Sequence, residues 1–165
     1  YIEPVALAPE PDHGGYKLDT GDTLRIYVFG QAELSRLYTV GADGTVSMPL
    51  IGSIHARGHT THSLERAVRS KLAASFVRDP YVAIEVNAYR PFFILGEVRN
   101  PGQYPFVVGM TLDHAVAIAG GYSPRARTGE AEISRPVDGF AISEHVTADD
   151  PVFPGDRITI AERWF

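Results

Sequence analysis

The sequence has no cysteine, no long apolar run and no excess of positive charge, and each absence excludes a class of protein. Without cysteine there can be no disulfide, no thiolate metal ligand and no cysteine nucleophile. The longest run of apolar residues and glycine, residues 115–122, has eight residues, whereas a membrane-spanning helix needs about 20. The net charge of −5 comes from mixed acidic and basic residues without a basic stripe, so we expect no nucleic-acid partner.

Glycine and proline, in contrast, are frequent, at 16 and 12 of 165 residues. Together with 44% hydrophobic and 21% charged residues, they indicate a globular chain of short strands and tight turns. Residues 1–15 read as an extended lead-in. They lack the basic start and apolar stretch of a secretion signal, so an exported protein would begin here after its signal and any lipid-bearing cysteine.

Residues 16–90 predict a small domain with a mixed sheet and one helix. Apolar and polar residues alternate over residues 23–29, which is typical of a half-buried strand. Asp43-Gly44 suits the positive φ angles of a tight turn, and we expect it to join strands 38–40 and 45–48 in a hairpin.

The same half continues into a helix and a further strand. Thr60 or Thr61 can cap a helix that runs to about Ala74, because the apolar residues in this stretch follow helical spacing. A strand over residues 81–86 follows. Arg90-Pro91 is then taken as the boundary between two domains.

Residues 91–165 repeat the cycle of strands and helix in an order that fits a β-grasp domain, a mixed sheet crossed by one helix. The overall class is therefore α+β. The expected elements are a strand at 92–95, a type II turn at 100–103, a return strand at 104–107, a helix at 112–119 capped by Thr111 and ended by Gly120-Gly121, a strand at 132–134, a turn at Asp138-Gly139 and a last strand at 155–160.

The two halves share a short sequence echo. Gly21-Asp22 and Gly155-Asp156 each precede a strand of alternating apolar residues. A duplicated element and a common turn that feeds a common strand pattern explain this equally well.

Two stretches resemble a known family. The first includes residues 16–24, 40–52 and 79–82, with the Asp-Gly turn in place, and is similar to the polysaccharide-export domain of Wza-type export proteins. The second includes residues 96–104, 119–122 and 154–158, and resembles the soluble-ligand-binding β-grasp (SLBB) domain that follows the export domain in that family. The ordered succession of both, over nearly the whole chain, is the specific feature.

The resemblance implies a periplasmic, non-enzymatic component of a capsular polysaccharide or exopolysaccharide export machine, associated with the outer membrane. It implies a homo-oligomeric ring that forms or caps the translocation channel, an inner-membrane polysaccharide co-polymerase as partner, and no cofactor. Larger members continue into a C-terminal helix that lines an outer-membrane pore, whereas this chain stops at Trp164-Phe165. The chain is therefore either a truncated piece of a larger member or a short family member that works with a separate outer-membrane pore protein, and we favour the short member.

Candidate contact residues lie on predicted loops of the second half. Arginines there could meet an acidic polysaccharide or a neighbouring subunit, although unpaired surface arginine is an equal alternative. The glycines could contact a ligand, but a helix stop is the more ordinary role. The candidates are Arg99, Gly120, Gly121, Tyr122, Arg125 and Arg127.

Other constellations support no chemistry. His55, His59 and His62 are close in sequence, but a glycine-containing turn separates them and we expect solvated histidines, not a metal site. Asp113 and His114 are adjacent on one helix and cannot face each other in a catalytic triad.

Aromatic residues such as Tyr89, Phe92, Tyr104 and Tyr122 could stack on sugars, but core or subunit contacts are the simpler expectation. Two rival functions remain open. One is a stand-alone periplasmic ligand- or sugar-binding β-grasp module, which would show a concave pocket and a stable monomer. The other is a polymer hydrolase, which would need two carboxylates facing one cleft.

Overall fold

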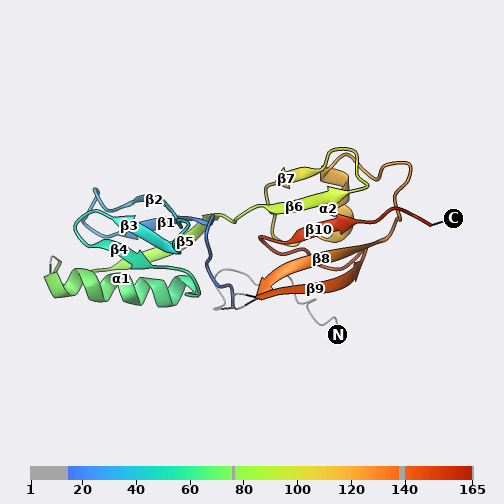
Figure 1. The fold of residues 1–165 in the computed structure, drawn as a ribbon. Coiled ribbons are helices and arrows are strands. Elements are labelled where there is room, and N and C mark those ends of the chain that lie inside the picture. Colours follow the sequence, from blue (N-terminus) through green and yellow to red (C-terminus); the bar gives the residue numbers. More distant parts are fainter. Residues whose placement is uncertain (1–14, 76, 138–139, 165) are drawn as a thin grey trace, which may run out of the picture. The chain divides into compact units, whose positions relative to one another are not determined.

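A computed structural model describes residues 15–75, 77–137 and 140–164, which form two compact units (Figure 1). The chain passes from the N-terminal unit (residues 15–90) to the C-terminal unit (residues 91–164) at the bond between Arg90 and Pro91. The expected lead-in lies outside the described residues, except for Gly15. No helix within these ranges is both long and apolar enough to cross a membrane.

The N-terminal unit contains a three-stranded sheet, a two-stranded sheet and a helix. In the larger sheet the central strand pairs antiparallel with both neighbours, in the order β2-β1-β5, while β3 pairs with β4. The elements are β1 (Thr23–Val28), β2 (Arg36–Thr39), β3 (Thr45–Met48), β4 (Gly52–His55), α1 (Thr61–Ser75) and β5 (Val82–Ala88).

Alternation in β1 and helical spacing in α1 build the core of this unit. Leu24, Ile26 and Val28 are fully buried on one face of β1. The helix adds Leu64, Val68 and Leu72 to the same core cluster. Burial of one such side chain stabilises the fold by about 1.5–3 kcal/mol. Of the two candidate caps, Thr60 caps α1, because its Oγ1 accepts a hydrogen bond from Ser63 N at 3.1 Å.

The predicted hairpin partners were wrong, although the turn between them forms. Gly44 has φ 79°, and Gly41 N donates to Thr45 O at 2.9 Å, as a tight turn requires. However, β2 pairs with β1 and β3 pairs with β4. Burial explains this choice, because Val46 and Ile54 lie opposite each other in the β3–β4 pair and are both buried there.

The C-terminal unit is a five-stranded mixed sheet crossed by one helix (Figure 1). Its first and last strands in sequence, β6 and β10, lie side by side and parallel at the centre of the order β7-β6-β10-β8-β9. The elements are β6 (Phe92–Gly96), β7 (Gly102–Tyr104), α2 (Leu112–Ile118), β8 (Glu130–Val137), β9 (Phe140–Thr147) and β10 (Arg157–Ile160). The predicted α+β class is confirmed, with a mixed sheet and one helix as expected of a β-grasp domain.

The N-cap of α2 and strands β6 and β10 form at the residues that the sequence predicted. Thr111 is the N-cap of α2, and Leu112 and Val116 of this helix are buried, as are Ile94 of β6 and Ile158 of β10. The type II turn was wrong: Gly102 has φ 156°, far from the value of about 80° that such a turn needs. Gly102 instead pairs with Ile94 as the first residue of β7.

Residues 130–147, where the sequence shows little alternation, form the longest strand pair of this unit. The predicted strand 132–134 is the middle of β8, which pairs with β9 over its whole length, and β9 was not predicted. Six of the eight residues of β9 are exposed in succession, so no inside–outside alternation marks the strand. The expected turn at Asp138-Gly139 lies outside the described residues.

Candidate functional site

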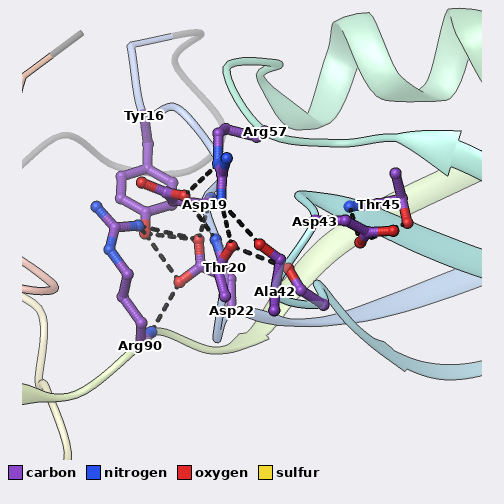
Figure 2. Close-up of polar contacts among 10 residues, drawn as sticks. Tyr16, Asp19, Thr20, Asp22, Ala42, Asp43, Thr45, Arg57 and Arg90 are labelled. Atoms are coloured by element: carbon purple, nitrogen blue, oxygen red, sulfur yellow. Dashed lines mark hydrogen bonds and ion pairs between the residues drawn. The ribbon is translucent and has the colours of Figure 1, made fainter. Parts of the chain in front are cut away.

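The most densely bonded polar group of the N-terminal unit surrounds Asp22, a fully buried carboxylate (Figure 2). Tyr16 donates its hydroxyl to both carboxylate oxygens at 3.0 and 2.9 Å. Asp19 N donates to Oδ2 at 3.0 Å and Arg90 N to Oδ1 at 2.7 Å. The Arg90 guanidinium completes the group, with Nη1 at 3.2 Å from Asp22 Oδ2 and 2.6 Å from the Tyr16 hydroxyl.

Burial dominates the electrostatics of this group. It raises the pKa of Asp22 above the ordinary value of a carboxyl, while the Arg90 guanidinium and the two backbone N–H groups pull it back. Burial and the adjacent Asp22 carboxylate raise the pKa of the Tyr16 hydroxyl far above its ordinary value. Tyr16 therefore stays a hydrogen-bond donor at any physiological pH.

A second layer, centred on Arg57, holds the turn that carries Asp22 (Figure 2). Arg57 Nε donates to Asp19 Oδ1 at 2.9 Å, and its Nη2 donates to Thr20 Oγ1 at 2.6 Å and to Ala42 O at 3.3 Å. Arg57 thereby connects the Asp22 turn to the tight turn that contains Gly44.

The C-terminal unit contains a matching ion pair. Asp156 is fully buried, and Arg135 Nε and Nη2 donate to its two oxygens at 2.8 Å each. Phe153 N donates to Asp156 Oδ2 at 2.7 Å, and the guanidinium lies 4.4 Å from the centre of the Phe153 ring. The hydrogen bonds from Arg135 to Asp156 raise the pKa of the Arg135 guanidinium.

The two Gly-Asp turns have the same geometry. Asp22 N donates to Asp19 O and Asp156 N to Phe153 O, three residues upstream in each case. The carboxylate then accepts the N–H of that same upstream residue. In each turn an arginine lies over the aromatic ring of the cluster, Arg90 over Tyr16 and Arg135 over Phe153. The repeated Gly-Asp motif in the sequence thus corresponds to a turn that occurs in both units. This motif was the sequence signal from which the two buried acids could have been predicted.

Neither ion pair is arranged for chemistry. Both carboxylates are fully buried, and protein donors already occupy the oxygens of each. A catalytic or binding carboxylate needs a free face toward a ligand. We therefore assign both pairs to holding the entries of β1 and β10.

The structure brings four of the predicted contact residues together at one end of the C-terminal sheet. Arg99 N donates to Gly121 O at 3.0 Å, and Tyr122 forms a β-bridge with Val98. Gly120 has φ 89°, a left-handed conformation that favours glycine, and a Cβ there would lie 3.1 Å from Arg99 Cβ in the other loop. The helix-stop role of Gly120 and Gly121 is visible in their N–H groups, which donate to the last carbonyls of α2.

The other two candidates, Arg125 and Arg127, lie on the following loop, beside the chain after β10. Arg125 Nη1 lies 3.6 Å from Glu162 Oε1, with both side chains more than half exposed. Arg127 Nε contacts Glu130, and Arg127 N donates to Ala161 O at 2.8 Å.

Arg127 also borders a shallow hollow of about 300 Å³ on the β8–β9–β10 part of the sheet. There His145 lies between two carboxylates, with Nδ1 at 2.9 Å from Glu132 and Nε2 at 3.6 Å from Glu130. Both acids are thus paired with cationic or imidazole side chains. The hollow is lined by an ion-pair network, and no Phe, Tyr or Trp lines it. A polymer hydrolase needs one carboxyl group as general acid and a second as nucleophile or base, whereas Glu130 and Glu132 are both held in contacts with His145.

The histidines singled out in the sequence lie apart from any metal-binding arrangement in the described residues, where no cluster of three potential ligands occurs. His55 and His59 have ring centres 6.1 Å apart, and His59 Nδ1 lies 2.9 Å from Ser63 Oγ. His114 Nδ1 accepts the Thr111 N–H in the capping box of α2. That contact uses the imidazole for helix capping.

With this geometry in view, comparisons with known proteins define the class. Residues 10–87 match the family described as polysaccharide biosynthesis/export protein, and residues 91–140 match the SLBB domain. The chain therefore belongs to the Wza-type polysaccharide export proteins, with an export domain followed by an SLBB domain.

Its relatives carry related names. The chain is 36% identical over 118 residues to the exopolysaccharide production protein ExoF of Rhizobium meliloti (strain 1021), covering 64% of this chain and 28% of that protein. It is 26% identical over 111 residues to the polysialic acid transport protein KpsD of Escherichia coli, covering 66% of this chain and 20% of that protein. The chain thus spans between a fifth and a third of the length of these curated relatives.

Proposed function

We propose that this protein is a non-catalytic periplasmic component of a capsular polysaccharide or exopolysaccharide export machine, which forms or caps the translocation channel. The observation that carries the proposal is the order of the two domains, export then SLBB, in one chain. The names of ExoF and KpsD support the substrate class. The burial of both Gly-Asp carboxylates supports a passive role, because these acids hold turns and present no face to a substrate.

The proposal includes partners. Copies of the chain associate in a homo-oligomeric ring, an inner-membrane polysaccharide co-polymerase delivers the polymer, and a separate outer-membrane pore protein completes the path. The exposed arginines near the end of the C-terminal sheet, Arg99, Arg125 and Arg127, together with the loop Gly120-Gly121-Tyr122, are the proposed contacts to polymer or to a neighbouring copy.

Deletion of the gene in the source organism tests the role directly. Surface polysaccharide, measured by immunoblot or total-carbohydrate assay of washed cells, should be lost, while lipid-linked precursors continue to be made. Complementation with the complete gene should restore the polymer. Normal surface polysaccharide in the deletion strain would eliminate the export role.

A second candidate, a stand-alone sugar-binding module, is favoured by one observation, the hollow beside Arg127 and His145. The two functions differ in assembly. Native mass spectrometry of the full-length, membrane-extracted protein should show a ring of several copies if the chain lines a channel. A strict monomer at high concentration would favour the binding module.

A further inference from the structure

The outer face of the β2-β1-β5 sheet carries the largest exposed aromatic residues of the N-terminal unit. The inner face of β1 is buried in the core, and the alternate residues point the other way. Tyr27 in β1, Phe29 directly after β1 and Tyr81 directly before β5 are 48%, 67% and 61% exposed. Several large aromatic side chains exposed close together in the chain fold mark a candidate contact surface, because each carries a large apolar area.

The three aromatic residues are neighbours along the backbone. Tyr27 lies in β1, and Phe29 is the first residue of the turn that follows this strand. Phe29 N donates to Tyr81 O at 3.0 Å, which places Phe29 and Tyr81 on neighbouring segments. Tyr27 pairs with Ala83 in β5, and this small side chain leaves room beside the tyrosine ring.

That room is a shallow hollow of about 330 Å³, lined by Arg25, Tyr27, Ala83, Ile84 and Glu85. Its size lies at the lower end of the range of small-ligand sites. Arg25 and Glu85 pair across β1 and β5, with Nε 3.5 Å from Oε1, and both side chains are more than half exposed. The hollow therefore has one aromatic ring, that of Tyr27, the N–H donors of Arg25, the two carboxylate oxygens of Glu85 and no net charge.

We propose that this face, defined by Tyr27, Phe29, Tyr81 and the Arg25–Glu85 pair, is a binding platform for the pyranose rings of an uncharged stretch of polysaccharide. The proposal rests on the proposed export function for the class of ligand, and it names the surface that the polymer touches. A pyranose ring has an apolar face of C–H groups that packs against an aromatic ring, and a rim of hydroxyls that both donate and accept hydrogen bonds. The aromatic group takes the first and the Arg25–Glu85 pair takes the second.

Charge selects the class of sugar. The guanidinium of Arg25 is already balanced by Glu85, so a carboxylated polymer finds no unpaired cation on this face. An uncharged ring exchanges its hydroxyl hydrogen bonds with both groups without breaking a charge balance. The open shape of the hollow keeps binding weak, which suits a moving polymer, since conduction requires that each site release what it binds.

The test is a titration of the complete 165-residue chain, labelled with 15N and with 13C in its aromatic side chains, followed by NMR. The probe is cellohexaose, a neutral pyranose oligomer, with an oligosialic acid of the same length as the anionic comparator. We expect saturable shifts at Tyr27, Phe29, Tyr81 and Arg25, with a dissociation constant on the order of 1 mM. We expect at least fivefold weaker binding of the sialic acid oligomer.

Substitutions distinguish stacking of the sugar on Tyr27 and Phe29 from non-specific binding to exposed aromatic residues. Tyr27→Ala and Phe29→Ala should each weaken cellohexaose binding at least fivefold, while Tyr27→Phe retains most of it because the ring face remains. Phe140→Ala is the matched control, since Phe140 is 76% exposed but lies on β9 of the other unit. Thermal unfolding of each variant checks that the fold is kept, and Tyr81→Ala replaces any variant that fails this check.

Three outcomes would overturn the platform. These are shifts confined to other surfaces, equal binding by the Tyr27→Ala and Phe140→Ala variants, and concentration-dependent shifts at the three rings without sugar, which would make the face a contact between copies. The export role is scored separately by complementation of the deletion strain. A failed titration with normal complementation by the unsubstituted gene rejects the platform alone, whereas failure of the deletion phenotype rejects the export function itself.

Discussion

Asp22 and Asp156 occupy equivalent positions in two copies of one turn, one in each unit. Each carboxylate is fully buried, accepts the N–H of the residue three positions upstream and pairs with an arginine that lies over an aromatic ring. The two arginines differ in sequence separation, because Arg90 is 68 residues from Asp22 and Arg135 is 21 residues from Asp156. Different chain segments thus complete the same turn in the two units.

Asp22→Ala should destabilise the N-terminal unit by about 3–5 kcal/mol, because it leaves the Arg90 guanidinium buried without its anion. Hydrogen–deuterium exchange read by mass spectrometry should show faster exchange in peptides from residues 15–90. Asp43→Ala is the control, since Asp43 is an exposed acid that bonds only to its own turn and Thr45. Equal exchange in the two variants would show that the buried pair contributes nothing to stability.

Asp156→Ala should destabilise the C-terminal unit, as Asp22→Ala destabilises the N-terminal unit. The Arg135 guanidinium loses two hydrogen bonds of 2.8 Å, and the entry of β10 loses its anchor at Phe153 N. Exchange should accelerate in peptides from residues 91–164. If the two units unfold independently, peptides from residues 15–90 keep their protection, and acceleration in both units would instead reveal one cooperative transition.

Gly96→Ala should destabilise the C-terminal unit more than Gly109→Ala does. Both glycines have φ near 85°, so each substitution carries the strain of a left-handed residue, about 1–2 kcal/mol. A Cβ at Gly96 would also lie 2.2 Å from Ile160 O, whereas a Cβ at Gly109 meets nothing within 4 Å. Urea denaturation should therefore show a further loss of about 1–3 kcal/mol for Gly96→Ala. Equal losses would mean that β10 moves aside at no cost.

His59 should make the N-terminal unit less stable in mild acid. Burial and the neighbouring His55 and Lys17 lower the pKa of His59 below its usual value of about 6.5. Its contribution is complete above the unfolded pKa and is lost as pH falls through the lower folded pKa, because the unfolded chain takes up the proton first. Urea midpoints between pH 7.5 and 5 should fall more steeply for the unsubstituted protein than for His59→Gln. Parallel slopes would contradict the assignment.

Local features of the fold were predictable because neighbouring residues decide them. The alternation in β1, the Thr111 cap of α2 and the glycine stop after it were each predicted, and each forms. The α+β class and the polysaccharide export family also followed from the order of motifs along the chain. Strand β9 was missed, because its residues are exposed on both faces and therefore show no alternation.

The candidate sites divide in the same way. The sequence placed Arg99 and Gly120–Tyr122 on loops, but only the structure shows that these loops meet. The aromatic platform was not predicted. Alternation places Arg25 and Tyr27 on the same face of β1, but it cannot say which face the rest of the domain leaves uncovered.

The sequence by itself determined the alternating strand β1, the cap and glycine stop of α2, the Asp43-Gly44 turn and the family, since these depend on residues a few positions apart. Only the tertiary structure decided that β3 pairs with β4, that Arg90 reaches Asp22, and that exposed Phe29 and Tyr81 are joined by a backbone hydrogen bond. The physical reason is distance along the chain. Strand partners and ion pairs are selected by burial of apolar area and by desolvation of charge, and both are properties of the folded whole.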